Sequence, residues 1–223
     1  MHHDYWQERW DKGEIGFHAS EANPLLVAHL DALAPGSIYV PMCGKSRDLT
    51  HLAERGFTVA GTEWVPEAAA AYFAEAGLMA ATSQLGPFAC LRSPELAVSL
   101  LVGDAFALAE VVPSPQLPLF DSAYDRASLV AIDPARRLDY VETMHRVLRP
   151  GGTLLLVTFD YDQQRLDGPP WSVNDELVRT LFEPRFALQR LEQRPAPVSP
   201  RFAAAGITEV TEVAYLLRRL GAK

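Results

Sequence analysis

Short apolar runs alternate with amphipathic segments along most of this chain, and each kind of segment predicts one kind of element. The apolar runs predict buried strands at residues 37–42, 58–62, 96–102, 119–124 and 153–159. The amphipathic segments predict helices at residues 49–55, 66–77 and 134–148. The alternation of strand and helix is typical of an α/β fold built on a mostly parallel sheet.

The last third of the chain follows a different pattern. A short helix is expected at residues 171–182, followed by long strands at 187–191 and 207–217 with a Pro-rich connection between them. This order predicts an antiparallel hairpin at one edge of the sheet. Residues 78–94 hold several turn-forming residues and predict a connection or a short hairpin.

Residues 37–63 have the pattern of a nucleoside-binding βαβ unit. The turn Cys43-Gly44-Lys45-Ser46 follows the first strand, and Glu63 comes at the end of the second. In a doubly wound sheet, ligands bind outside the C-terminal ends of the strands, and an acidic side chain there can bind the ribose hydroxyls. We therefore expect a nucleoside cofactor whose ribose is bound by Glu63.

The glycine content of this turn narrows the choice of nucleoside. A dinucleotide site needs the pattern G-x-G-x-x-G to approach a pyrophosphate, whereas this turn has Gly44 alone. A phosphate-binding P-loop also ends in Gly-Lys-Ser, but it needs a glycine at the position of Tyr39. S-adenosylmethionine has a ribose and no phosphate, so it suits such a turn, and NAD is the alternative that the missing glycines count against.

Composition limits the partners of the protein. The 223 residues carry a net charge of −8 without a basic stripe, so nucleic acid is not expected as a partner. No apolar run approaches the about 18 residues of a membrane span, and the polar N-terminus predicts no signal peptide. Two cysteines suit a reducing compartment, so a cytoplasmic location is expected. A monomer is also expected. We expect no metal, because His2, His3 and His18 lack the spacing of a zinc site.

Several strings of residues, taken together and in this order, resemble the thiopurine S-methyltransferases, including their bacterial members. The strings are Trp6 to Trp10 (WQERW), Gly16-Phe17-His18, Asn23-Pro24, Pro41 to Ser46 (PMCGKS), Gly61-Thr62-Glu63, Tyr124 to Ala127 (YDRA) and Gly168 to Val173 (GPPWSV). The resemblance implies a class I methyltransferase (Rossmann-like) fold with a central, mostly parallel seven-stranded sheet and an antiparallel C-terminal edge hairpin. We expect one domain, residues 1–223, in which residues 1–30 form a helical cap over the active site.

The residue pattern and the resemblance together suggest roles for particular side chains. The candidates for binding S-adenosylmethionine are Trp10, Met42, Gly44, Glu63, Asp104, Ala105 and Arg126. The candidates for binding the acceptor are Phe17, His18 and Trp171, and the candidates for a catalytic role are His18 and Arg126. Asp104 has the alternative role of forming a turn next to the strand. Arg126 has the alternative role of a surface salt bridge with Asp125 or Asp133.

Other side chains near the turn have plainer expected roles. Lys45, Ser46 and Asp48 are expected to cap and solubilise the first turn of the following helix. Cys43 is expected to pack behind the cofactor, because no His or Asn motif completes a cysteine hydrolase.

The chain departs from the resembled family at three positions. Family members more often have Leu, Ser and Phe where this chain has Met42, Val65 and Trp171. Val65 removes a hydroxyl near the ribose, and Trp171 enlarges a ring that we expect beside the acceptor. The choice of acceptor is therefore the property that transfers least from the family to this chain.

The predicted function is transfer of a methyl group from S-adenosylmethionine to the sulfur of an aromatic or heterocyclic thiol. An in-line displacement of this kind depends mostly on positioning, and a thiol ionises readily enough to need no dedicated base. Selenium or tellurium acceptors, in a detoxification role, are a related possibility. The alternatives are a non-catalytic S-adenosylmethionine-binding protein and an NAD-dependent oxidoreductase.

Overall fold

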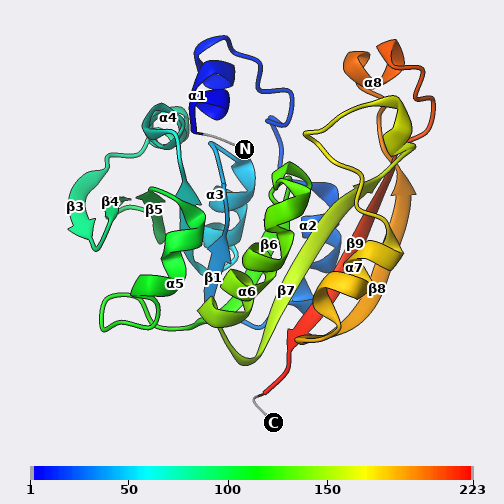
Figure 1. Ribbon diagram of the computed structural model, residues 1–223. Helices are drawn as coiled ribbons and strands as arrows, with labels where there is room; N and C mark the ends of the chain where they lie inside the picture. The colour runs from blue at the N-terminus through cyan, green and yellow to red at the C-terminus, as the bar shows by residue number, and fades with distance from the viewer. Residues whose placement is uncertain (1–2, 222–223) are drawn as a thin grey trace.

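One mixed sheet runs through residues 3–221, the part of the chain that the computed structural model describes (Figure 1). Within these residues the sheet has nine strands in the order β3-β4-β5-β2-β1-β6-β7-β9-β8. The strands are β1 (Ser37–Val40), β2 (Thr58–Glu63), β3 (Ala81–Leu85), β4 (Phe88–Arg92), β5 (Val98–Val102), β6 (Phe120–Arg126), β7 (Leu148–Asp160), β8 (Phe186–Pro195) and β9 (Thr211–Arg219).

The centre of the sheet is parallel and both of its edges are antiparallel. β5, β2, β1, β6 and β7 run in the same direction, as the strand pattern predicts. β9 pairs with β7 and β8 with β9 in antiparallel fashion, which confirms the predicted C-terminal hairpin. The number of strands is nine and not seven, because β3 and β4 form a hairpin that adds two antiparallel strands beside β5.

Helices cover both faces of this sheet. They are α1 (His3–Asp11), α2 (Pro24–His29), α3 (Arg47–Glu54), α4 (Pro66–Ala76), α5 (Leu108–Val111), α6 (Arg137–Val147), α7 (Asp175–Phe182) and α8 (Pro200–Ala204). Short 3₁₀ turns are η1 (Leu30–Ala32), η2 (Ala105–Ala107), η3 (Leu129–Ala131), η4 (Pro134–Arg136) and η5 (Gln163–Arg165). None of the helices within residues 3–221 is long and apolar enough to cross a membrane.

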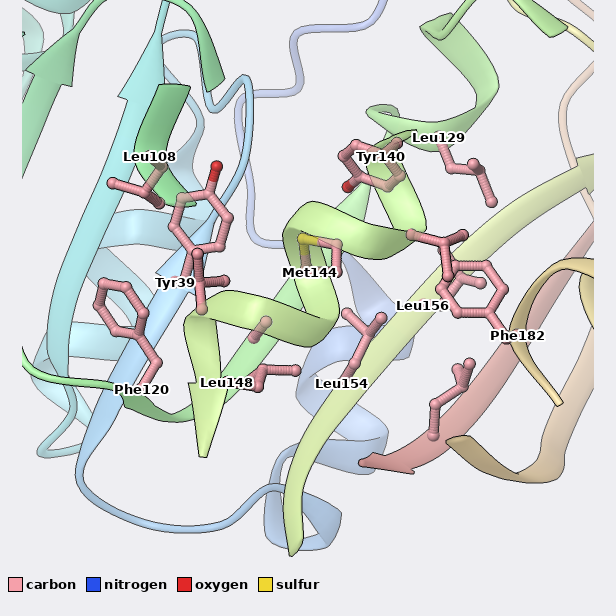
Figure 2. Packing of buried hydrophobic residues seen from close by; sticks show 14 of the residues in the cluster. Tyr39, Leu108, Phe120, Leu129, Tyr140, Met144, Leu148, Leu154, Leu156 and Phe182 are labelled. Carbon is pink, nitrogen blue, oxygen red and sulfur yellow. The ribbon is translucent and has the colours of Figure 1, made fainter. Parts of the chain in front are cut away.

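Two apolar clusters fill the space between the helices and the sheet. α5, α6 and α7 supply buried side chains to one cluster, and α2, α3 and α4 supply them to the other. Figure 2 shows the first cluster, where Met144 of α6 lies among side chains of the sheet. Tyr39 and Phe120 stack there with their ring centroids 5.4 Å apart. Burial of each such large side chain stabilises the fold by about 1.5–3 kcal/mol.

Local sequence signals explain where several helices begin and end. The side chain of Asn23 accepts hydrogen bonds from the first amides of α2, and that of Ser46 accepts one from the amide of Asp48 in α3. α4 begins at Pro66 and ends before Gly77, whose φ of 68° is the left-handed conformation that glycine tolerates. The ends of α4 agree with the predicted positions, whereas α3 begins two residues before its predicted start.

Two boundaries in the last third of the chain differ from the prediction. The helix expected from Trp171 begins at Asp175, because the side chain of Asn174 caps the amide of Leu177. The last strand begins at Thr211 and not at residue 207, and the Pro-rich connection before it contains α8, which the side chain of Ser199 caps.

Residues 3–30 have two different surroundings. α1 has no buried residue, whereas Leu25 and Leu26 of α2 are fully buried in the core. The apolar face of α2 therefore packs in the core, and the role of residues 1–30 as a cap over the active site stays a prediction.

Candidate active site

The C-terminal ends of the parallel strands meet along one edge of the sheet, the upper edge in Figure 1. α1 and α8 lie beyond this edge, α1 on the side of β2 and α8 on the side of β9. A cavity of about 940 Å³ lies along the edge, lined by residues of the strand ends and of both helices. Doubly wound sheets bind their ligands at this position, in pockets of about 300–1,000 Å³.

The cavity brings together all but one of the site residues that the sequence predicts. Its lining includes Trp10, Phe17, His18, Met42, Gly44, Glu63, Asp104, Ala105 and Arg126. These residues are spread over more than 100 positions of the chain. Met42, Gly44, Glu63, Asp104, Ala105 and Arg126 meet because their strands end at the same edge, whereas Trp10, Phe17 and His18 come from α1 and the segment after it. Trp171 is absent from the lining.

Glu63 is a buried carboxylate at the end of β2, only 6% exposed. Its Oε2 accepts a hydrogen bond of 2.8 Å from the amide of Gly44, and its Oε1 accepts one of 2.7 Å from the amide of Val65. Burial raises the pKa of Glu63, and the amides of Val65 and Gly44 oppose the rise. Each carboxylate oxygen has a second lone pair, so Glu63 keeps the capacity to accept a hydrogen bond from a ligand.

The turn after β1 holds two residues in the left-handed conformation. Gly44 has a φ of 54°, and a Cβ there would lie 3.3 Å from the ring of Trp10. The lack of a side chain therefore allows the Trp10 ring to lie against the turn. Met42 has a φ of 44°, which costs a residue with a side chain about 1–2 kcal/mol. Its amide donates to the hydroxyl of Thr62, which holds the turn against β2.

Asp104 and Ala105 follow β5 at the same edge. The carboxylate of Asp104 accepts a hydrogen bond of 3.0 Å from the amide of Phe106 and caps η2. The turn-forming role of Asp104 is thus present, and its contact with a cofactor stays a prediction. Nearby, the guanidinium of Arg136 lies 3.8 Å from the centroid of the Phe106 ring. The sequence prediction missed this pair, because its members are about 30 positions apart in the chain.

Arg126 ends β6 and reaches the N-terminal segment. Its Nη1 donates a hydrogen bond to the carbonyl oxygen of Phe17. Its Nε is buried and has no hydrogen-bond partner among the described residues. A buried donor without a partner costs about 1–3 kcal/mol, so the Nε is well suited to an anionic or carbonyl group of a ligand.

His18 lines the cavity beside an ion pair of two charged side chains. Its Nε2 is 4.0 Å from the carboxylate of Glu75 in α4, and the Nζ of Lys45 is 2.5 Å from the same carboxylate. Burial lowers the pKa of His18, and the charge of Lys45 lowers it further, so the ring is neutral at pH 7. Lys45 therefore pairs with α4, in addition to lining the cavity.

Asp48 differs from its expected role as a solvated residue of the helix cap. It is only 4% exposed, and its carboxylate accepts hydrogen bonds from the amide of Asn23 and the hydroxyl of Tyr124. The expectation was wrong because α2 covers this face of α3, so the side chain is enclosed by the core.

Trp171 supports the wall of the cavity and does not line it. A Cβ at Gly168 would lie 2.3 Å from the indole of Trp171, so the ring packs directly against the chain at that glycine. Its amide donates to the carbonyl of Val130. Pro169 and Pro170, which precede it, line the cavity, and the expected contact between Trp171 and the acceptor stays a prediction.

The far end of the cavity contains charged residues that the sequence prediction missed. Arg201 of α8 donates hydrogen bonds to the carbonyls of Pro169 and Asp167, and so it holds the proline segment in place. Glu212 of β9 also lines the cavity, although it is 6% exposed. Glu212 directly precedes the apolar run of β9 from Val213 to Leu217, and no local pattern shows that this end of the strand reaches the cavity.

A second buried carboxylate, Asp125, organises the loop that follows β6. It accepts hydrogen bonds from the amides of Ser128 and Leu129 and one of 2.6 Å from the hydroxyl of Tyr140. Burial raises the pKa of Asp125 to about 6, and these hydrogen bonds limit the rise. Ala127 between them has a φ of 71°, so the carboxylate stabilises a strained loop that lines the cavity.

The remaining candidates for chemistry are the Cys43 thiol and a metal site. Burial raises the pKa of the Cys43 thiol and the charge of Glu63 raises it further, which does not suit a nucleophile. Across residues 3–221, no group of three or more His, Cys, Asp or Glu side chains is arranged to hold a metal ion. His2 lies outside the described residues, and the absence of a metal stays a prediction.

Comparison with known proteins gives consistent results over the whole chain. A family model described as thiopurine S-methyltransferase (TPMT) matches residues 1–220. The thiopurine S-methyltransferase of Pseudomonas fluorescens (strain SBW25) is 38% identical over 221 residues, which cover 97% of this chain and 99% of the relative. That of Xanthomonas campestris pv. campestris (strain 8004) is 40% identical over 225 residues, which cover 98% of this chain and 100% of the relative.

Solved structures confirm the expected class I methyltransferase fold. The 1,6-didemethyltoxoflavin-N1-methyltransferase of Burkholderia thailandensis, solved with S-adenosylhomocysteine, has a TM-score of 0.63 and 18% identity. The match covers 98% of this chain and 87% of that chain. An S-adenosylmethionine-dependent methyltransferase of Methanosarcina mazei has a TM-score of 0.62 and 17% identity, and the match covers 91% of this chain and 100% of that chain.

Proposed function

Because this chain belongs to the thiopurine S-methyltransferase family, we propose that it transfers the methyl group of S-adenosylmethionine to the sulfur of aromatic or heterocyclic thiols. The family match over residues 1–220 supports the reaction. The observation that carries the acceptor class is a single cavity that has a buried carboxylate at one end and aromatic and proline walls at the other.

The residues of the cavity fit S-adenosylmethionine. At about 940 Å³, the cavity is near the upper end of the usual range for small-molecule sites, which leaves room for a second small molecule. Glu63 offers acceptor capacity to the ribose hydroxyls, and the unpaired Nε of Arg126 offers a donor to the carboxylate of the methionine part. The turn at Gly44 approaches a nucleoside without the nest of amides that a polyphosphate needs.

Further cofactor contacts follow from the order of the strands. Asp104 and Ala105, at the end of β5, are assigned to the adenine, since β5 lies on the far side of β2 from β1. Trp10 and Met42 are assigned to the sulfonium end, where the Trp10 ring attracts a cation through its face. When bound, S-adenosylmethionine supplies a methyl group that is activated by the sulfonium charge.

The chain's own contribution is to orient the acceptor and exclude water. Phe17 contacts Trp6 and Trp10 edge to face, with ring centroids 5.9 and 6.0 Å apart, and we assign it to the acceptor wall. His18, which is neutral at pH 7, is assigned a polar contact with the acceptor. An aromatic wall of this kind removes water from the thiolate, and removal of water strengthens every electrostatic interaction in the site.

Two alternative functions make different predictions for this protein. A non-catalytic S-adenosylmethionine-binding protein would bind the cofactor through Glu63 and Trp10 without turnover. An NAD-dependent oxidoreductase would need the glycine pattern that the turn at Gly44 lacks, and the family match is to methyltransferases.

The test of this proposal is S-adenosylhomocysteine formation by the purified protein. Parallel reactions contain S-adenosylmethionine with 6-mercaptopurine, thiophenol, selenite, tellurite or no acceptor. We expect product that depends on a thiol. Turnover with selenite or tellurite alone would replace the thiol with a metalloid acceptor, and binding without any turnover would support the non-catalytic alternative.

A further inference from the structure

Two buried carboxylates line the cavity four strand spacings apart in the sheet. Glu63 ends β2, and Glu212 is the second residue of β9, with β1, β6 and β7 between them. At about 4.8 Å per strand spacing, β2 and β9 are about 19 Å apart across the sheet. Since the proposed function places the ribose at Glu63, Glu212 lies at the acceptor end.

Within residues 3–221, only one of the two carboxylate oxygens of Glu212 accepts hydrogen bonds. Its Oε2 accepts hydrogen bonds of 2.7 Å and 3.1 Å from the Nη2 and Nε of Arg194. Its Oε1 accepts no hydrogen bond from residues 3–221. Oε1 is also not one of the side-chain atoms that are both fully buried and without a hydrogen-bond partner. Oε1 therefore keeps surface that is open to the cavity, whereas Glu63 has an amide on each of its oxygens.

Apart from Arg194, Ser199 and Arg201, the lining near the start of β9 is apolar and suits a flat ring. Phe159 is its neighbour on β7, and Pro170, Pro197 and Phe202 line the same cavity. A charge in such a wall costs free energy unless it is paired and hydrogen-bonded. Arg194 provides the pairing, but it uses only Oε2. The open Oε1 is therefore available to a donor on the bound molecule.

We propose that Oε1 of Glu212 accepts a hydrogen bond from a ring N–H of the acceptor, and so selects heterocyclic thiones over simple aryl thiols. The substrate class is the cyclic thioamide, which carries an N–H beside its C=S group. This inference rests on the proposed function. As the thione sulfur bonds to the methyl carbon, the bond from that carbon to the sulfonium sulfur breaks and S-adenosylhomocysteine is the leaving group. The acceptor becomes an S-methylated cation, so its ring N–H becomes a better donor, and this proton is lost to water when the product is released. The hydrogen bond is then stronger in the transition state than in the bound substrate, which raises the rate of transfer.

The variant Glu212→Gln tests the proposal. Arg194 requires an acceptor, so the introduced amide keeps its carbonyl oxygen toward Arg194 and turns its NH₂ group toward the cavity. A donor then faces the N–H of a thione. We expect kcat/KM for pyridine-2-thione, which has an N–H, to fall roughly ten- to a hundredfold, the usual range for a hydrogen bond to a charged group. For thiophenol, which has no N–H, we expect a change of less than about threefold.

The matched control is Arg194→Gln, which breaks the same ion pair and leaves the carboxylate in the cavity. We expect this variant to retain the preference of the wild type for pyridine-2-thione over thiophenol. If Glu212→Gln lowers kcat/KM for both acceptors equally, or if Arg194→Gln loses the preference as well, Glu212 has a structural role only and the proposal is overturned.

Binding of 2-pyridone and phenol separates this inference from the proposed function. Neither compound contains sulfur, and only 2-pyridone carries a ring N–H, so the comparison needs no turnover. With S-adenosylhomocysteine present, we expect Glu212→Gln to weaken binding of 2-pyridone, measured by calorimetry, and to leave that of phenol unchanged. If the wild type methylates neither thiol, the proposed function fails, but this binding difference still supports the role of Glu212. Equal binding of 2-pyridone by both proteins would contradict it.

Discussion

Glu63 is the side chain to which we assign the ribose of the cofactor. The substitution Glu63→Ala removes the acceptor for the ribose hydroxyls and for the amides of Gly44 and Val65. We expect the affinity for S-adenosylhomocysteine to fall by about 1–3 kcal/mol, measured by calorimetry on a variant whose circular dichroism shows that it is folded. Unchanged affinity in the folded variant would remove this assignment.

Phe17 offers a matched substitution in the same cavity. Phe17→Ala removes an aromatic face from the acceptor wall, while the hydrogen bond from Arg126 to its backbone carbonyl is retained. We expect a higher KM for thiols and little change in the affinity for S-adenosylhomocysteine. The opposite pattern, with cofactor binding lost and KM unchanged, would place Phe17 on the cofactor.

Asp125 makes a testable contribution to the pH dependence of stability. Its pKa is about 6 in the folded protein and near 3.8 in the unfolded chain, so the folded state holds the proton more tightly. The free energy of unfolding therefore falls as pH rises from about 4 to 6, by about 3 kcal/mol from this group, and levels off above. Asp125→Asn removes this slope, and urea unfolding at several pH values measures it. An unchanged slope in the variant would show that Asp125 does not titrate in this range.

The side chains at the ends of the parallel strands were predictable from the sequence, whereas those of β9 and α8 were not. Glu63, Asp104 and Arg126 each follow a parallel strand, and such residues always arrive at the same edge. Glu212 comes to this edge at the start of an antiparallel strand, and Arg201 comes with a helix inside a loop. Their position depends on tertiary pairing that no local pattern contains.

At the level of elements, α2 and α3 are joined to β6 by a buried hydrogen-bond network. Asp48 in α3 accepts from the amide of Asn23 before α2 and from the hydroxyl of Tyr124 in β6, at 2.7 and 3.1 Å. Tyr124→Phe leaves this buried carboxylate with one donor fewer. We expect the free energy of unfolding to fall by about 1–3 kcal/mol, measured by urea denaturation.

Tyr72→Phe is the control for this network. It removes a hydrogen bond between two hydroxyls, those of Tyr72 and Thr50, with no charged partner. We expect a smaller loss, about 0.5–1.5 kcal/mol. Equal losses in the Tyr72 and Tyr124 variants would mean that the carboxylate of Asp48 gains nothing from Tyr124.

The elements themselves were predictable where periodicity and end signals agree. α4 has both a proline at its start and a glycine after its end, and its predicted range is the observed one. α8 was not predictable, because five residues within a Pro-rich connection are too few to show a helical period. α2 was not predicted as a separate helix, because six residues are too few to show a helical period.

At the scale of the whole molecule, one mixed sheet brings the residues that we assign to the cofactor and those that we assign to the acceptor along one cavity. The order β5-β2-β1-β6-β7-β9 determines which residues face each end. The class I fold follows from the alternation of strands and helices, whereas the additional hairpin of β3 and β4 extends the sheet away from the cavity. The segment from α1 to His18 contributes cavity lining without burying a residue of α1 in the core.

The transferred methyl group can be followed directly to the atom that receives it. The protein is incubated with S-adenosylmethionine that carries a ¹³C-labelled methyl group and with pyridine-2-thione, which offers both a sulfur and a nitrogen. Nuclear magnetic resonance then distinguishes an S-methyl from an N-methyl product by carbon chemical shift. We predict that the label appears on sulfur. Label on the ring nitrogen, or no transfer to any thiol under conditions where S-adenosylmethionine binds, would contradict a sulfur methyltransferase.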